Sequence, residues 1–179
     1  SDEIYEKLIY DGAKHLSIAA FNKDIYDLTI TVNGLSKSYS MTGWRIGYAA
    51  GPKELIAAMI TIQQYSFVCA PSMSQYACLH YPEFDLSKYQ LEYKLKRDTI
   101  YEGLKAGGFE VQKPNGAFYI FPQVRFGTDA EFVEKAIQNN VLIIPGSVFS
   151  EKKTHFRISF AAPLETLKRG AEILSKLKA

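Results

Sequence analysis

The residues best suited to chemistry lie in a short polar segment, residues 33–48, between two predicted strands. This segment contains Lys37, Arg45, several hydroxyl side chains and several glycines. A lysine whose pKa is lowered can attack a carbonyl group and form a Schiff base. Hydroxyls, backbone N–H groups and a guanidinium together bind a phosphate group. Hydroxyl-rich loops are also common as plain solvated turns, so spacing alone leaves both interpretations open.

Three further residues are candidates on weaker grounds. Asp2 and Tyr5 are three residues apart, which places both side chains on one face of a turn. Arg157 lies in a predicted strand and faces away from its apolar neighbours. By themselves these patterns are more typical of a capping pair near a chain end, for Asp2 and Tyr5, and of a surface charge, for Arg157.

Metal and disulfide chemistry have little support in the sequence. The histidines, His15, His80 and His155, are scattered without the spacing of metal ligands. The two cysteines, Cys69 and Cys78, are too few for a disulfide scaffold or a four-cysteine zinc site. We therefore predict no metal site and a pair of reduced thiols.

Composition narrows the classes of protein. The chain has 179 residues, of which 47% are hydrophobic and 22% charged, so bulk disorder is excluded. Its 21 basic and 19 acidic residues give a net charge of +2, which argues against a strongly basic nucleic-acid binder. No apolar run approaches the roughly 18 residues of a membrane helix. Few cysteines and no visible signal peptide favour the cytoplasm.

The elements that must position these side chains alternate between strands and helices. Leu28, Ile30 and Val32 alternate with threonines, which predicts a strand that ends at Gly34. Further strands are predicted at 46–50, 109–112, 116–121, 141–144 and 155–160, and helices at 52–64, 71–81, 85–106, 129–139 and 163–177. This order indicates a layered α/β or α+β fold. The character of the sequence changes near Phe84, where we expect a domain boundary.

A family resemblance unites these observations. The residues Gly34-Leu35-Ser36-Lys37, followed by Ser40-Met41, Gly43 and Arg45-Ile46-Gly47, resemble the signature of class I/II aminotransferases. These are fold-type I enzymes that use pyridoxal 5'-phosphate (PLP). Other segments resemble further motifs of the family in the family's order: Ser1-Asp2-Glu3-Ile4-Tyr5-Glu6, Pro114 to Tyr119, Pro145 to Phe149 and Phe156 to Ala161. The resemblance is closest to the branch of aspartate and aromatic aminotransferases.

The resemblance implies a particular part of a known α/β fold. Residues 1–84 would be the C-terminal part of the large, mixed-sheet PLP-binding domain. Residues 85–179 would be the small α+β domain at the C-terminus. The chain opens abruptly, with a cofactor motif already at Asp2. We therefore expect a fragment of a PLP-dependent transferase fold that lacks its N-terminal half and has little or no activity alone.

The same resemblance implies a role for each candidate at the cofactor. Lys37 would form the aldimine with PLP and then move a proton between the substrate's Cα and the cofactor. Asp2 would pair with the pyridine nitrogen, and Tyr5 with the phenolic oxygen. Arg45 and Ser36 would bind the phosphate. The family often has a phosphate-binding hydroxyl three residues before the lysine, but here that position is Gly34, which leaves the source of that hydroxyl open.

The implied reaction exchanges an amino group between an amino acid and a 2-oxo acid, with Arg157 binding the substrate α-carboxylate. The family's sites lie at a subunit interface, which implies a homodimer, with neither nucleic acid nor membrane as a partner. Three alternatives remain from the sequence. They are a PLP-dependent β-lyase or synthase of the same fold, an aminotransferase-like effector domain of a transcriptional regulator, and a catalytically inactive module.

Overall fold

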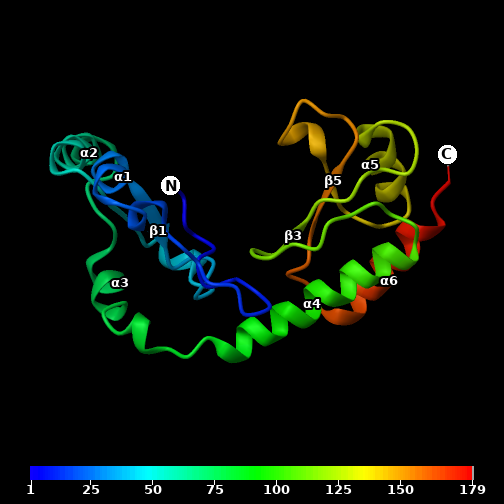
Figure 1. Ribbon diagram of the computed structural model, residues 1–179, viewed down its shortest axis with the longest axis horizontal. Helices are drawn as coiled ribbons and strands as arrows, with labels where there is room; N and C mark the ends of the chain where they lie inside the picture. Colours follow the sequence, from blue (N-terminus) through cyan, green and yellow to red (C-terminus); the bar gives the residue numbers. More distant parts are fainter. Residues whose placement is uncertain (179) are drawn as a thin grey trace. The chain divides into compact units, whose positions relative to one another are not determined.

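The computed structural model describes residues 1–178, which form two compact units. The first unit is Ser1–Ser87 and the second begins at Lys88. The elements of each unit can be followed in Figure 1 by label and colour. No helix among the described residues is both long enough and apolar enough to cross a membrane.

The first unit is built around a short antiparallel pair of strands. Strand β1 (Thr31–Gly34) pairs with β2 (Gly47–Ala50), and Gly34 lies opposite Gly47. The unit's helices are α1 (Lys23–Leu28), α2 (Lys53–Ser66) and α3 (Ser72–Ala77), with short 3-10 turns η1 (Ile18–Ala20), η2 (Thr42–Trp44) and η3 (Tyr81–Glu83). The connection between β1 and β2, residues 35–46, therefore contains Lys37 and Arg45 and has a paired strand at each end.

The predicted strand from Leu28 begins too early, because Leu28 is the last residue of α1 and Thr29 and Ile30 have no strand assignment. The side chain of Asn22 caps this helix by accepting a hydrogen bond from the Ile25 N–H at 2.9 Å. Lys23 and Asp27 form an ion pair across one turn at 2.7 Å. A cap and a pair of this kind favour a helix. The alternating residues become a strand only from Thr31 onward, where β2 supplies a partner.

The second unit packs two long helices against a three-stranded antiparallel sheet. The strands are β3 (Tyr119–Ile120), β4 (Ile144–Pro145) and β5 (Phe156–Ser159), with β5 in the centre. The helices are α4 (Ser87–Ala106), α5 (Asp129–Gln138) and α6 (Leu164–Lys176), and the turn η4 (Gly146–Val148) follows β4. All five helices and strands that we predicted here from 116 onward exist, but the strands are shorter than expected.

The strand predicted at 109–112 does not form. These residues have no strand assignment. The Glu110 carbonyl accepts a hydrogen bond from the Gln123 N–H at 2.9 Å, but no strand pairing follows from it. The apolar side chains along α4 are only half buried. Ile100 and Leu104 are in the core, whereas the Tyr89 side chain is 55% exposed. In the N-terminal half of α4 the Tyr93 ring stacks on that of Phe118 at 5.8 Å, and the C-terminal half packs against a partner helix.

That partner is α6, and small residues let the two helices approach closely. A Cβ atom at Gly103 would lie 2.7 Å from the Cβ of Ala171, and one at Gly107 would lie 2.8 Å from the Cβ of Ser175. Larger side chains would push the helices apart. A cluster of aromatic rings lies between α5 and the sheet. The Phe132 and Phe156 rings stack with their centres 4.9 Å apart, and the Phe109 ring meets that of Phe156 edge-on at 5.8 Å. This cluster is the centre of the second unit's core.

Candidate functional site

Five of the residues predicted from the sequence line one pocket of the first unit. They are Asp2, Tyr5, Ser36, Lys37 and Arg45. The cavity measures about 490 Å³ and opens to solvent on one side. These residues come from two segments more than thirty positions apart in the sequence, so the tertiary structure, and not the loop alone, assembles the pocket.

Strand-like pairing places Asp2 beside the lysine-bearing loop. Asp2 forms a parallel bridge with Val32, supported by hydrogen bonds from the Glu3 N–H to the Val32 carbonyl and from the Val32 N–H to the Ser1 carbonyl, both 2.8 Å. The chain then turns, and the Asp2 carboxylate accepts the Ile4 N–H at 3.1 Å. This turn brings the Tyr5 side chain to the same pocket.

Lys37 lies in the turn that directly follows β1. Leu35, which is 2% exposed, anchors the start of this turn in the interior. The Leu35 carbonyl accepts the Tyr39 N–H at 3.2 Å. The buried Ser38 hydroxyl donates to the Ile4 carbonyl at 3.4 Å and so links the loop to the Asp2 segment. These contacts hold Lys37, which is itself half-buried, at the pocket wall.

Arg45 reaches the pocket through a left-handed backbone turn. It follows the 3-10 turn η2 with φ of 54°, a region that residues with a Cβ seldom occupy. Its guanidinium donates to the Thr42 carbonyl at 2.9 Å. Unusual backbone angles of this kind persist where the surrounding structure requires a particular side-chain direction. Here the result is a guanidinium at the cavity that Asp2 and Tyr5 also line.

Tight strand pairing explains why a glycine stands at position 34. A Cβ atom there would lie 2.9 Å from the Ile46 carbonyl oxygen and 3.2 Å from the Gly47 Cα. A serine would therefore collide with the backbone of the neighbouring strand. The aliphatic hydroxyls that do line the pocket are those of Ser36 and Thr42. Sequence reasoning missed Thr42, although its place inside the signature segment was a usable signal.

The pocket combines cationic, anionic and hydroxyl groups. Lys37 and Arg45 supply positive charge, Asp2 supplies a carboxylate, and Ser36, Thr42 and Tyr5 supply hydroxyls. Asn33, which sequence reasoning also missed, is buried and lines the same wall. Such a set can bind a phosphate on the cationic side while the carboxylate faces a different, protonated group.

Arg157, the remaining predicted site residue, lies on β5 in the second unit. The sequence predicted that its neighbours Phe156, Ile158 and Phe160 face the core, and these side chains are 0%, 8% and 0% exposed. Arg157 projects from the opposite face of the strand and is half-buried. Its guanidinium carbon lies over two aromatic rings. It is 4.5 Å from the centre of the Tyr119 ring and 4.1 Å from the centre of the Phe149 ring.

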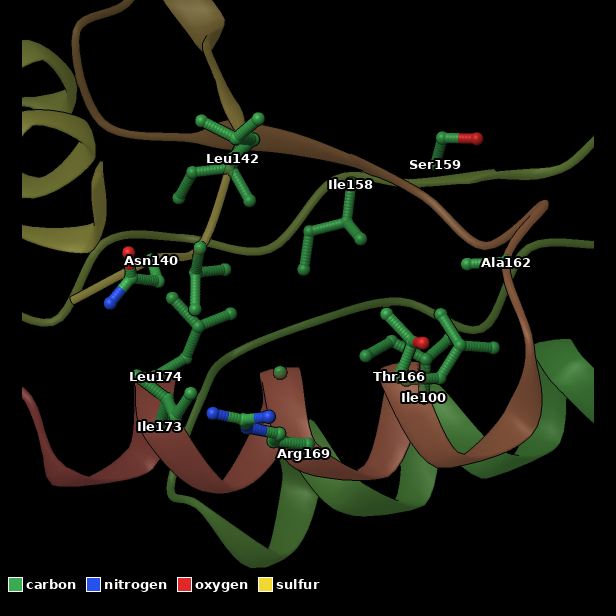
Figure 2. A pocket seen from close by; sticks show the side chains of 14 residues that line it. Ile100, Asn140, Leu142, Ile158, Ser159, Ala162, Thr166, Arg169, Ile173 and Leu174 are labelled. Carbon is green, nitrogen blue, oxygen red and sulfur yellow. The ribbon is translucent and has the colours of Figure 1, made fainter.

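A second cavity of about 450 Å³ lies in the second unit, and none of the predicted site residues lines it. Figure 2 shows its aliphatic lining: Ile173 and Leu174 come from α6, Ile100 from α4, and Leu142 and Ile158 from the opposite side. Its polar groups are few. The cavity therefore shows no arrangement that resembles the first pocket in chemistry.

A small polar cluster near the N-terminus was not anticipated. Ligand-type atoms of Glu3, Glu6 and His15 lie within 4.8 Å of one another. The buried Glu3 carboxylate accepts a hydrogen bond from Ser17 at 2.6 Å and meets His15 Nε2 at 2.8 Å. Burial opposes ionisation of Glu3, but these hydrogen bonds hold its pKa below the usual value. The cluster binds the segment around residue 15 to the turn that carries Asp2 and Tyr5.

Comparison with known proteins places this geometry in context. The family described as "Aminotransferase class I and II" matches residues 1–174. A "Probable aspartate aminotransferase" of Methanocaldococcus jannaschii is 43% identical, over 99% of this chain and 48% of that protein. An aspartate aminotransferase of a Bacillus species is 40% identical, over 98% of this chain and 48% of that protein.

Solved structures agree with the sequence relatives. The aromatic aminotransferase from Pyrococcus horikoshii superposes with a TM-score of 0.93 at 35% identity, over 98% of this chain and 49% of the other. The chain thus spans about half the length of the relatives it matches. Its fold is an α/β part of the fold of these enzymes, as the resemblance implied.

Proposed function

Because the chain belongs to the class I and II aminotransferase family, we propose that it forms the lysine-bearing part of an aminotransferase active site. The protein that contains it would transfer an amino group from an amino acid to a 2-oxo acid. The observation that carries this proposal is the single pocket lined by Asp2, Tyr5, Ser36, Lys37 and Arg45. The relatives' names, which include aspartate and aromatic aminotransferases, support this substrate class.

The donor set of the pocket fits PLP, the cofactor that the family implies. When bound, PLP supplies an aldehyde that captures amino groups and an electron-poor ring that stabilises negative charge on the substrate's Cα. Arg45, with the hydroxyls of Ser36 and Thr42, would hold its phosphate. Asp2 would face the ring nitrogen and Tyr5 the phenolic oxygen. Each polar group of the cofactor thus has a partner of suitable charge among the residues at the pocket.

Each of these residues then has a distinct task. Lys37 takes a proton from the substrate's Cα and returns one, which requires an amine that is neutral for part of the cycle. The Asp2 carboxylate stabilises a proton on the ring nitrogen. Arg45 neutralises and orients the phosphate, so that the lysine and the substrate meet in a constant geometry. In the second unit, Arg157 would bind the α-carboxylate that all amino-acid substrates share.

The remaining assignments stay predictions of the same hypothesis. They are the large-domain and small-domain roles of residues 1–84 and 85–179, the homodimer and the cytoplasmic location. An assay of the whole protein with amino acids and 2-oxo acids would test the activity directly. Formation of a new amino acid and a new 2-oxo acid supports transamination, whereas release of ammonia and pyruvate from a cysteine conjugate would favour the lyase alternative.

The lysine assignment can be tested on this chain. We expect that incubation with PLP, followed by borohydride reduction and peptide mass spectrometry, labels Lys37 in preference to other lysines. The Lys37→Arg variant should lose that label. Lys53→Arg is the matched control, because Lys53 lies on α2 and does not line the pocket. Equal labelling of many lysines in the unchanged chain and in Lys37→Arg would contradict the assignment.

A further inference from the structure

The surroundings of Arg157 follow from the order of strands in the second unit's sheet. Central strand β5 has β3 on one side and β4 on the other. Tyr119 of β3 lies opposite Ser159, and Ile144 of β4 lies opposite Arg157 itself. Because paired residues and residues two apart share one face of a sheet, Tyr119, Ser159 and Arg157 all project from the same face.

Two rings reach the guanidinium from opposite sides of β5. Tyr119 comes from β3, whereas Phe149 follows the turn η4 that begins where β4 ends. The guanidinium carbon lies 4.5 Å from the centre of the Tyr119 ring and 4.1 Å from that of Phe149. Both distances are those of a cation in contact with a ring face. We define Tyr119 and Phe149 as the aromatic clamp.

The ring of Phe149 is held in place by its own turn. The Phe149 N–H donates to the Gly146 carbonyl at 2.8 Å, and the Ser147 N–H donates to the Asp129 carboxylate at 2.7 Å. A Cβ atom at Gly146 would lie only 2.5 Å from the His155 carbonyl oxygen, so the turn is pressed against the residue that precedes β5. The turn that carries Phe149 is therefore held by a backbone hydrogen bond, by the Asp129 carboxylate and by close contact with His155.

The clamp restricts how an anion can approach Arg157. With rings over the guanidinium, its N–H groups remain accessible mainly at the edge, in the guanidinium plane. A carboxylate is planar and can accept two parallel N–H bonds in that plane. A tetrahedral anion such as a phosphonate must place an oxygen outside the plane, toward ring faces that carry partial negative charge.

From this geometry we infer that Tyr119 and Phe149 are positioning residues that make the Arg157 site selective for planar carboxylates over tetrahedral oxyanions. The inference rests on the proposed function, in which Arg157 binds the substrate α-carboxylate. It adds two residues and a rule of discrimination: amino acids are accepted, and their phosphonate analogues are rejected, because of the clamp.

The test uses the whole enzyme that contains this chain. It compares KM and kcat for an amino acid with the inhibition constant of the phosphonate analogue of the same amino acid. Removing one ring, in Tyr119→Leu or Phe149→Leu, should raise KM about fivefold, change kcat less, and lower the preference for carboxylate over phosphonate by a similar factor. The ring-keeping variants Tyr119→Phe and Phe149→Tyr should restore most of both losses.

The control is Phe126→Leu, because Phe126 belongs to the same unit but packs on the Phe132 ring, at 5.1 Å, and not on Arg157 or on the turn that carries Phe149. A merely structural effect of losing a ring would appear in this variant as well. If the clamp variants raise KM but leave the carboxylate preference unchanged, the inference is overturned. If Arg157→Ala itself leaves KM for the amino acid unchanged, the proposed role of Arg157 fails first, and that outcome is separate from a failure of the clamp alone.

Discussion

Asp98 on α4 is the centre of a charged cluster in the second unit. One of its oxygens accepts hydrogen bonds from Arg97 at 2.7 Å and from Lys113 at 2.9 Å, and the other accepts from Lys94 at 2.9 Å. The Arg97 side chain is 0% exposed and also donates to the Pro114 carbonyl at 3.2 Å. Asp98 thus balances a buried charge that supports the loop leading to Tyr119.

The Asp98 cluster predicts a pH-dependent contribution to stability. Burial opposes ionisation of Asp98, but hydrogen bonds from Lys113, Lys94 and Arg97 outweigh it and hold the pKa well below its usual range. A carboxyl group with a lowered pKa stabilises the fold above its unfolded-state pKa of about 3.9, and this stabilisation is lost as the pH falls below that value. We expect Asp98→Asn to cost about 2 kcal/mol at pH 7, and less at pH 3.

Urea unfolding at the two pH values measures this difference. The control is Glu165→Gln, the same change of carboxylate to amide on α6, where the ion pair with Lys168 is at the surface and the two side chains are 84% and 55% exposed. Exposed pairs contribute little, so this variant should lose less than about 0.5 kcal/mol. Equal losses in the two variants, or a loss in Asp98→Asn that does not depend on pH, would refute the explanation.

At the scale of elements, helix α5 shows how local sequence sets a boundary. Thr128 and Glu131 form a reciprocal cap: the Glu131 carboxylate accepts the Thr128 N–H at 2.8 Å, and the Thr128 hydroxyl accepts the Glu131 N–H at 3.3 Å. The hydrogen bonds that the Thr128 N–H and hydroxyl donate to the carboxylate lower the pKa of Glu131. The cap starts a helix that buries Phe132, Val133 and Ala136 against the sheet.

We expect Thr128→Ala to lower the free energy of unfolding by about 1 kcal/mol, because one N–H at the helix start loses its acceptor. Thermal or urea unfolding gives the value. Thr128→Ser keeps the hydroxyl and should stay close to the unchanged chain. If the serine variant lost as much as the alanine variant, the methyl group of Thr128, and not the cap, would be the cause.

Elements differed in how well the sequence predicted them. Helices α2, α4, α5 and α6 lie close to their predicted ranges, because caps, glycines and a 3.6-residue period are local signals. Strands were predicted less well. Strands β3 and β4 have two residues each, and β4 includes Pro145, which cannot donate a hydrogen bond. Such short strands form only because β5 lies between them and pairs with both. The local sequence of a strand does not show which distant strand will pair with it.

At the scale of the whole molecule, burial is distributed unevenly between the two units. The bulky side chains of Phe132, Phe156 and Phe160 in the second unit are 0% exposed. In the first unit, none of the described residues of α2 is buried, and Ile62 and Tyr65 on that helix are 67% and 88% exposed. Local stability follows buried apolar contact, so the units should differ in how readily they open.

Hydrogen exchange followed by mass spectrometry should show this difference. We expect peptides from α2 to exchange early and peptides from α5 and β5 to exchange last. Binding of PLP at the first unit's pocket should slow exchange in residues 33–48 and leave α5 unchanged, because a ligand stabilises the region that it contacts. Uniform protection across both units, or PLP-dependent changes confined to the second unit, would be inconsistent with this structure.

The sequence by itself determined the family and the local chemistry of the lysine-bearing loop, because Ser36, Lys37 and Arg45 lie within one short motif. Only the tertiary structure decided which distant residues meet them. Asp2 reaches the loop through its bridge to Val32, and Arg157 acquires two rings from the strands and turns beside β5. Pairing between strands is a contact between distant parts of the chain, and the chain reveals such a contact only when it is folded.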